Sequence, residues 1–172
     1  MNVFLVGPMG SGKSAVGRQL AQRLALEFID SDAEIEARTG VDIAYIFERE
    51  GEAGFRSREA EVIDAISRRD GVLVSTGGGA ILDAGTRERL RTRGRVVYLR
   101  TSVDQQLART RRSNDRPLLN NDDPRGTLER LFEQRAPLYT EVAEIVVDTD
   151  GRKVKTVVDQ ICHQLGVDGV EP

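Results

Sequence analysis

Short apolar runs recur along the chain, and stretches with helical spacing lie between most of them. Such runs are typical of strands buried on both faces of a sheet. The alternation of runs and helical stretches therefore predicts an α/β fold, in which a parallel sheet is covered by helices on both faces. The apolar runs occupy residues 3–6, 27–29, 72–74, 96–99 and 145–147.

Two segments depart from this alternation. Residues 42–69 have no strand signal and carry two helical stretches that are broken near Gly51 and Gly54, which predicts an inserted helical subdomain. Residues 111–124 are polar and rich in turn-forming residues. Long loops in compact domains often close over a site, so we expect this segment to be a lid.

The most informative motif lies at residues 7–14, which read Gly-Pro-Met-Gly-Ser-Gly-Lys-Ser. It follows the first apolar run and precedes a helical pattern over residues 15–26, as a phosphate-binding loop requires. Backbone N–H groups of such a loop converge on phosphate oxygens, Lys13 can bridge the outer phosphates, and the Ser14 hydroxyl can hold magnesium. The alternative is an ordinary glycine turn between a strand and a helix.

Composition narrows the possible functions. The chain of 172 residues has 39% hydrophobic residues, which suits one domain spanning residues 1–172. Its 25 basic and 28 acidic residues give a net charge of −3, so no overall positive field attracts nucleic acid or an anionic membrane. Only three of the basic residues are lysines, so Lys13 in the phosphate motif stands out from the background.

The chain carries no signal for export or membrane insertion. No apolar stretch approaches the roughly twenty residues that cross a bilayer. The N-terminal apolar run lacks a preceding basic region and a cleavage signature, so we expect a cytoplasmic protein. Cys162 is the only cysteine and stands beside the only histidine, His163, which excludes an internal disulfide and leaves too few ligands for a structural zinc site.

Two carboxylates follow the second apolar run, in the sequence Asp30-Ser31-Asp32. This position is the carboxyl edge of a predicted strand, where open parallel sheets bind ligands. One carboxylate can order magnesium, and the other can accept a hydrogen bond from a substrate hydroxyl. The alternative is that Ser31 or Asp32 caps a helix that begins near Ala33.

Other residues could complete a phosphoryl-transfer site. Residues 77–79 are consecutive glycines after the third run, and they suit either close approach of a ligand or a plain turn. Glu59 can brace Arg56 from one helical turn away, and Arg135 precedes a proline that can disturb its helix. Two arginines in one pocket would grip a carboxylate in a bidentate manner. Each of these signals is weak alone, because exposed ion pairs are common.

Taken together, these motifs resemble those of shikimate kinase over essentially the whole chain. The resemblance implies a fold like that of nucleoside monophosphate kinases, with a five-stranded parallel sheet, a substrate-binding helical region at about 31–60 and a lid at about 111–124. It also implies ATP-dependent phosphorylation of the 3-hydroxyl of shikimate, a step toward chorismate and the aromatic amino acids. The motifs that carry it are the phosphate loop, Asp30-Ser31-Asp32, Arg56 with Glu59, Gly77-Gly78-Gly79, Arg116-Pro117-Leu118-Leu119 and Arg135-x-Pro-Leu-Tyr.

The resemblance assigns roles at the nucleotide end of the site. Ser14 would bind magnesium, and Asp30 would support the water shell of the metal. Arg116 would act on the phosphates from the lid, while Arg152 and also Arg109 would lie beside the adenine. The ATP phosphates would be held by Gly10, Ser11, Gly12, Lys13, Ser14 and Ala15.

The resemblance also assigns roles to the residues at the substrate end of the site. Asp32 would take the acceptor hydroxyl, and Arg56 and Arg135 would bind the carboxylate of shikimate together with the backbone at Gly78 and Gly79. Lys13, Asp32 and Arg116 would then be the catalytic residues. Many relatives have threonine at positions 15 and 31, where this chain has alanine and serine. Members of the family tend to be monomers, and we expect the same here.

Three other functions remain as alternatives. A kinase for gluconate or a nucleotide would share the loop and the sheet, but would not need the arginine pair. A guanine-specific switch generally uses Asn-Lys-x-Asp, and no lysine here follows an asparagine. A nucleic-acid motor would need a basic groove with aromatic residues, which a net charge of −3 and 5% aromatic content do not offer. Asp148 follows the last apolar run, a position where other phosphate-loop enzymes can have a metal ligand. The resemblance gives Asp148 no metal role. It instead places Ser75 and Thr76, at the end of the third strand, where their hydroxyls could order water bound to the metal.

Overall fold

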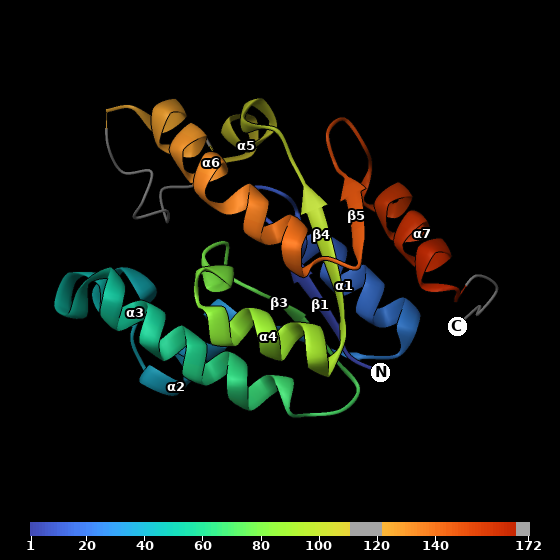
Figure 1. Cartoon of the computed structure of the whole chain (residues 1–172), viewed down its shortest axis with the longest axis horizontal. Helices are drawn as coiled ribbons and strands as arrows, with labels where there is room; N and C mark the ends of the chain where they lie inside the picture. Colours follow the sequence, from blue (N-terminus) through green and yellow to red (C-terminus); the bar gives the residue numbers. More distant parts are fainter. Residues whose placement is uncertain (111–121, 168–172) are drawn as a thin grey trace.

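The computed structural model describes residues 1–110 and 122–167. Its centre is a five-stranded sheet in the order β2-β3-β1-β4-β5, and every neighbouring pair is parallel (Figure 1). The α/β fold and the parallel sheet predicted from the apolar runs are therefore confirmed. The strands are β1 (Val3–Val6), β2 (Glu27–Asp30), β3 (Val72–Ser75), β4 (Arg95–Arg100) and β5 (Ile145–Asp148).

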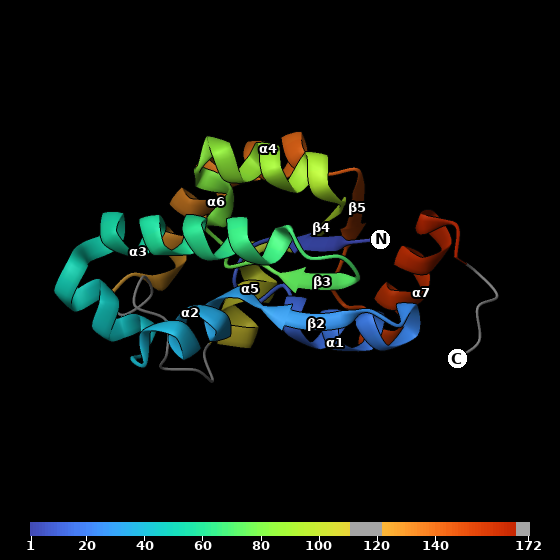
Figure 2. The same ribbon diagram turned by 90° about the horizontal axis from the view of Figure 1, so that it is seen from below.

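One face of the sheet is covered by α1 (Lys13–Leu24) and α7 (Val154–Leu165). Leu20 of α1 and Ile161 of α7 are fully buried against Leu5 and Leu99 of the central strands. Because β1 is apolar at every position, its alternate side chains fill the cores on both faces. Figure 2 shows α1 and α7 on the opposite side of the sheet from α4 and α6.

The other face is covered by a larger group of helices. Phe55 and Ile63 of the longest helix pack in the same core as Phe4 and Tyr98 of the sheet. Tyr139 stacks on Tyr98 with ring centroids 5.0 Å apart, which seats the last of these helices on β4. The elements of this layer are α2 (Ser31–Thr39), α3 (Ile43–Ser67), the short 3-10 helix η1 (Ala80–Leu82), α4 (Ala84–Arg93) and α6 (Pro124–Val142).

The helical region after β2 agrees with its prediction at Gly51 and differs from it at Gly54. Its two helical stretches, both within the bounds of α3, meet at a kink at Gly51, whose φ of 71° and ψ of −178° are not helical. Gly54 lies inside the helix and does not break it. No helix in the described parts of the chain is long and apolar enough to cross a membrane.

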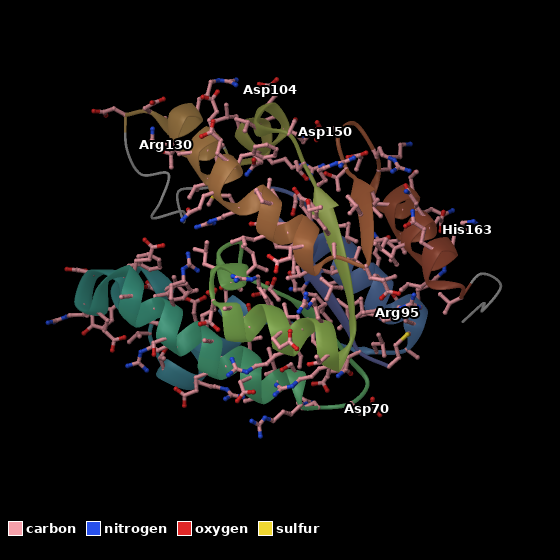
Figure 3. The ribbon with its side chains drawn as sticks, in the orientation of Figure 1. Asp70, Arg95, Asp104, Arg130, Asp150 and His163 are labelled. Atoms are coloured by element: carbon pink, nitrogen blue, oxygen red, sulfur yellow. The ribbon has the colours of Figure 1, made fainter. Side chains whose placement is uncertain are left out.

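The carboxyl ends of the strands define one end of the molecule. The short helix α5 (Val103–Thr110) follows β4 at this end and contacts α6. Figure 3 shows Asp104 of α5 and Asp150 of the turn after β5 at this end, while Asp70 and Arg95 lie at the opposite end, where β3 and β4 begin. Ligands of open parallel sheets bind at the carboxyl end.

Candidate active site

The phosphate loop connects β1 directly to α1. Gly12 has φ 87° and lies immediately before Lys13, the first residue of α1, and no side chain caps this helix. The N–H groups of its first turn therefore remain available for an anion. Gly7 comes close to β4, since a Cβ there would lie 2.7 Å from the Leu99 carbonyl oxygen. The Lys13 ammonium donates to the carbonyl oxygens of Gly7 at 2.7 Å and Pro8 at 2.8 Å, which holds the lysine over the loop.

A cavity of about 560 Å³ opens beside this loop. Its walls include both carboxylates of the Asp30-Ser31-Asp32 motif and the first two glycines after β3, so the cavity joins the phosphate loop to Asp32 and Gly78 of the predicted substrate site. The residues that line it are Met9, Gly10, Gly12, Lys13, Ser14, Ala15, Asp30, Asp32, Ala33, Glu36, Ser75, Thr76, Gly77, Gly78, Arg109 and Thr110.

Asp30 lies between α2 and the phosphate loop. Its carboxylate accepts from the backbone N–H of Ala33 at 3.0 Å and from the Ser14 hydroxyl at 3.2 Å. Asp30 is therefore the N-cap of α2, and the alternative that Ser31 or Asp32 caps this helix is wrong. The paired hydroxyl and carboxylate oxygens are the ligand type that Mg²⁺ prefers, so Ser14 and Asp30 fit a magnesium site.

Asp32 and the buried Glu59 converge on the first glycine after β3. A Cβ at Gly77 would lie 2.9 Å from Asp32 Oδ1 and 2.7 Å from Glu59 Oε2. Ser31, fully buried, accepts from the Gly77 N–H at 3.0 Å and ties this turn to α2. The two carboxylates thus approach the same backbone from α2 and α3.

Glu59 braces Arg56, as the sequence predicts. Arg56 Nη1 donates to Glu59 Oε1 at 2.9 Å, and Arg56 Nη2 lies 3.6 Å from Glu52 Oε1. Burial raises the pKa of Glu59 to about 7; Arg56 opposes this shift, and the negative charge of Asp32 adds to it. The carboxyl group is therefore close to half-protonated at neutral pH.

Arg135 reaches the same place from α6. It is 3% exposed, and a Cβ at Gly78 would lie 3.5 Å from its Nη1. The Tyr139 hydroxyl donates to the Gly78 carbonyl oxygen and lies near the Arg135 guanidinium. Burial lowers the pKa of Arg135, and the positive charge of Arg56 lowers it further, which shows that the two guanidinium groups are close. The helix continues past Pro137 to Val142, so the expectation that this proline breaks it is wrong.

The next glycine, Gly79, lies against the guanidinium of Arg56. A Cβ at Gly79 would lie 2.6 Å from Arg56 Nη1, and closer still to other guanidinium atoms. The structure thus brings Asp32, Arg56 and Arg135 together around residues 77–79, beside the cavity that contains the phosphate loop.

The two arginines predicted to lie near adenine share a second cavity, of about 280 Å³. Arg109 Nη1 donates to the Gly10 carbonyl oxygen at 3.0 Å, which places α5 over the phosphate loop. Arg152 Nη1 donates to the Asp148 carbonyl oxygen at 3.0 Å. The Asp148 carboxylate is engaged by Arg100, with Nε 2.6 Å from Oδ1.

Other sequence predictions stay untested or lie outside the described residues. The Thr76 hydroxyl donates to the Leu5 carbonyl oxygen at 2.9 Å and, like Ser75, lines the cavity, so its oxygen can still accept from water on a metal. Arg116 and residues 111–121 of the predicted lid lie outside the described residues, and residue 124 already belongs to α6. Sequence reasoning also missed Gln106, whose Nε2 donates to the Met9 carbonyl oxygen at 2.9 Å. No motif marks this glutamine.

Comparisons with known proteins agree with this geometry. A family model described as shikimate kinase matches residues 9–166. A shikimate kinase from Shewanella amazonensis is 56% identical over 165 residues, which cover 96% of each chain. A solved structure, shikimate kinase from Acinetobacter baumannii in complex with shikimate, superposes with a TM-score of 0.94 at 46% identity and covers 99% of this chain and 95% of that one. A shikimate kinase structure from Bacteroides thetaiotaomicron has a TM-score of 0.89 at 31% identity and covers 96% of this chain and 98% of that one.

Proposed function

The chain belongs to the shikimate kinase family, and from this membership we propose how its residues carry out the ATP-dependent phosphorylation of shikimate. The reaction transfers the γ-phosphoryl group of ATP to the 3-hydroxyl and gives shikimate 3-phosphate and ADP, a step toward the aromatic amino acids. One observation carries the proposal. Asp32, Arg56 and Arg135 converge around residues 77–79, at the cavity that the phosphate loop also lines.

At the nucleotide end, residues 10–15 bind the ATP phosphates through backbone N–H groups and the positive end of α1. Lys13 adds a charge at the outer phosphates. The Ser14 hydroxyl and, through water, the Asp30 carboxylate would hold Mg²⁺, which would supply positive charge beside the phosphates. The adenine occupies the second cavity between Arg109 and Arg152.

At the substrate end, Arg56 and Arg135 bind the carboxylate of shikimate, with backbone contacts from Gly78 and Gly79. Both arginines are held in place before the substrate arrives, by Glu59 and by Tyr139. Because the side chains are already ordered, little conformational entropy is lost on binding. This grip turns the 3-hydroxyl of the ring toward Asp32 and the phosphate loop.

Asp32 then orients the 3-hydroxyl and accepts its proton as the oxygen attacks the γ-phosphoryl group in line. Lys13 stabilises the charge on the transferred group, and we assign the same role to Arg116 from the lid segment. Closure of that segment over both ligands excludes water, which would otherwise compete as the acceptor.

We propose that the protein works as a cytoplasmic monomer of one domain, spanning residues 1–172, with ATP and shikimate as its ligands and neither nucleic acid nor membrane as a partner. The charge balance supports the last point, since a net charge of −3 provides no general attraction for polyanions. Sedimentation of the purified protein would test the monomer directly.

An ADP-release assay with four acceptors tests the proposed function. Shikimate, quinate, gluconate and a nucleoside monophosphate are compared at equal concentration with saturating ATP and Mg²⁺. We expect shikimate to give by far the fastest turnover, and Arg135→Ala to lose shikimate affinity while it keeps ATP affinity. Faster turnover with gluconate or with the nucleotide would contradict the assignment.

A further inference from the structure

Gln106 of α5 has a buried side-chain amide whose nitrogen donates a hydrogen bond and whose oxygen accepts none from the described residues. It is 2% exposed, and its Nε2 donates to the Met9 carbonyl oxygen of the phosphate loop at 2.9 Å. A carbonyl can only accept, so this bond fixes the orientation of the amide and turns Oε1 away from Met9. Among the described residues, no group donates a hydrogen bond to Oε1, although the atom is fully buried.

A complementary atom belongs to Arg135. Its Nε is also fully buried and has no acceptor among the described residues. Gln106 and Arg135 both line a cavity of about 10 Å³, together with Pro8, Met9 and Tyr139. This volume is close to the minimum that holds one water molecule. One acceptor and one donor thus border a cavity of the size of a single water, whose other walls include the apolar side chains of Leu128, Leu131 and Phe132.

We propose that Gln106 is a positioning residue that links the phosphate loop to Arg135, with one buried water molecule bridging Gln106 Oε1 and Arg135 Nε. Each buried polar atom left without a partner costs about 1–3 kcal/mol, so the bridge relieves a penalty at both ends. Tyr139, whose hydroxyl donates to the Gly78 carbonyl oxygen, also lies near the Arg135 guanidinium. The inference rests on the proposed role of Arg135 in binding the carboxylate of shikimate.

The linkage gives the two substrates a physical connection. Helix α5 packs directly on the loop, since a Cβ at Gly10 would lie 3.3 Å from the Gln106 Cα atom. A shift of the Met9 carbonyl on nucleotide binding therefore moves the amide, and with it the bridge to Arg135. Any such coupling is reciprocal, so nucleotide and shikimate must change each other's affinity by the same factor.

Gln106→Met tests this linkage, because methionine has nearly the same length and carries neither the donor nor the acceptor. Calorimetric titration gives the dissociation constant for shikimate without and with saturating ADP and Mg²⁺. We expect shikimate to bind about tenfold more weakly than to the wild type, as the loss of one buried hydrogen-bonded link implies. The affinity for ADP alone should stay within about twofold, and the factor by which ADP improves shikimate binding should fall to about one.

Asp104→Asn is the matched control. Asp104 lies on the same helix and pairs with Arg125 of α6 at 2.8 Å, but both side chains are exposed. The control removes a contact between α5 and α6 without touching the amide, so it should leave both affinities and their coupling unchanged. A second variant, Gln106→Glu, keeps an acceptor toward Arg135 and loses the donor to Met9. It should therefore keep the shikimate affinity and lose the coupling, which tests the linkage even if Gln106→Met fails to fold.

The outcomes separate this inference from the proposed function. A folded Gln106→Met protein with unchanged shikimate affinity would overturn the inference. It would also be overturned if ADP does not change the shikimate affinity of the wild type, or if the Gln106→Glu protein keeps the coupling between ADP and shikimate. A crystal structure with a water molecule between Gln106 Oε1 and Arg135 Nε supports it. Normal shikimate binding by Arg135→Ala would instead contradict the proposed function itself.

Discussion

Gly79→Ala is the sharpest test of the substrate site, because it displaces the guanidinium of Arg56 while Arg56 itself is not mutated. Gly79 has φ −99° and ψ 5°, which alanine also adopts, so the backbone resists the change little. The new Cβ, however, would lie 2.6 Å from Arg56 Nη1, well inside contact distance. The guanidinium must therefore leave the position in which Glu59 Oε1 holds it at 2.9 Å.

The size of the effect follows from the bond that is lost. A hydrogen bond to a charged group contributes about 1.5–3 kcal/mol, so the KM for shikimate should rise about 10- to 150-fold. The KM for ATP should change by less than about twofold, since the residue lies outside the phosphate loop. The free energy of unfolding should change little. Arg56 is long and flexible, and Glu59, with a pKa of about 7, can take up a proton when its partner leaves.

Steady-state kinetics of a double-mutant cycle provide the assay. If alanine at position 79 acts only by displacing Arg56, it should have no further effect once Arg56 is already alanine. Gly79→Ala with Arg56→Ala should then match Arg56→Ala alone, and the interaction free energy should equal the whole effect of Gly79→Ala. Additive effects, or an unchanged KM for shikimate in Gly79→Ala, would refute the placement of Arg56 against this glycine.

Three further predictions concern other parts of the site. Asp32→Asn should lower kcat about 10²- to 10⁴-fold with little change in the urea midpoint, and a fully active variant would exclude Asp32 as the base. Glu59 binds its proton more tightly in the folded chain, so stability should fall by roughly 3 kcal/mol as pH rises from about 4.5 to about 7 and then level off. Urea titrations should show this slope in the wild type and a flatter one in Glu59→Gln. Ser14→Ala should raise the Mg²⁺ concentration needed for half-maximal activity, whereas an unchanged requirement would remove Ser14 from the metal site.

The sheet could be predicted from the sequence because parallel strands that are buried on both faces are continuous runs of apolar residues. Each apolar run falls within an observed strand, and the strands extend at most one residue beyond it at either end. The added residues are Asp30, Ser75, Arg95, Arg100 and Asp148. All but the buried Ser75 are at least partly exposed, because the hydrogen-bond ladder continues past the point where side chains leave the core. Hydrophobic periodicity cannot detect these residues, although Asp30 and Ser75 are among those that line the cavity.

Details that depend on three-dimensional contacts were less accessible. Capping depends on where the first helical turn begins, and a shift of two residues, from Ala33 to Ser31, makes Asp30 the cap in place of Ser31 or Asp32. Gly51 and Gly54 look alike in the sequence, yet only Gly51 adopts a positive φ. Gln106 was not predicted because its bond to Met9 joins residues 97 positions apart, and nothing local marks either end.

The use of lysine and arginine in the site follows from what each cation has to do. In the proposed site Arg56 holds Glu59 and binds the substrate at the same time, and a planar fork with several donors can do both without moving. Lys13 instead donates to the carbonyl oxygens of Gly7 and Pro8, bonds that a phosphate can replace by a rotation of a flexible stem. A rigid arginine pair suits a carboxylate that stays in one place throughout the reaction. A mobile lysine suits the γ-phosphoryl group, which must be followed from ATP to the acceptor oxygen.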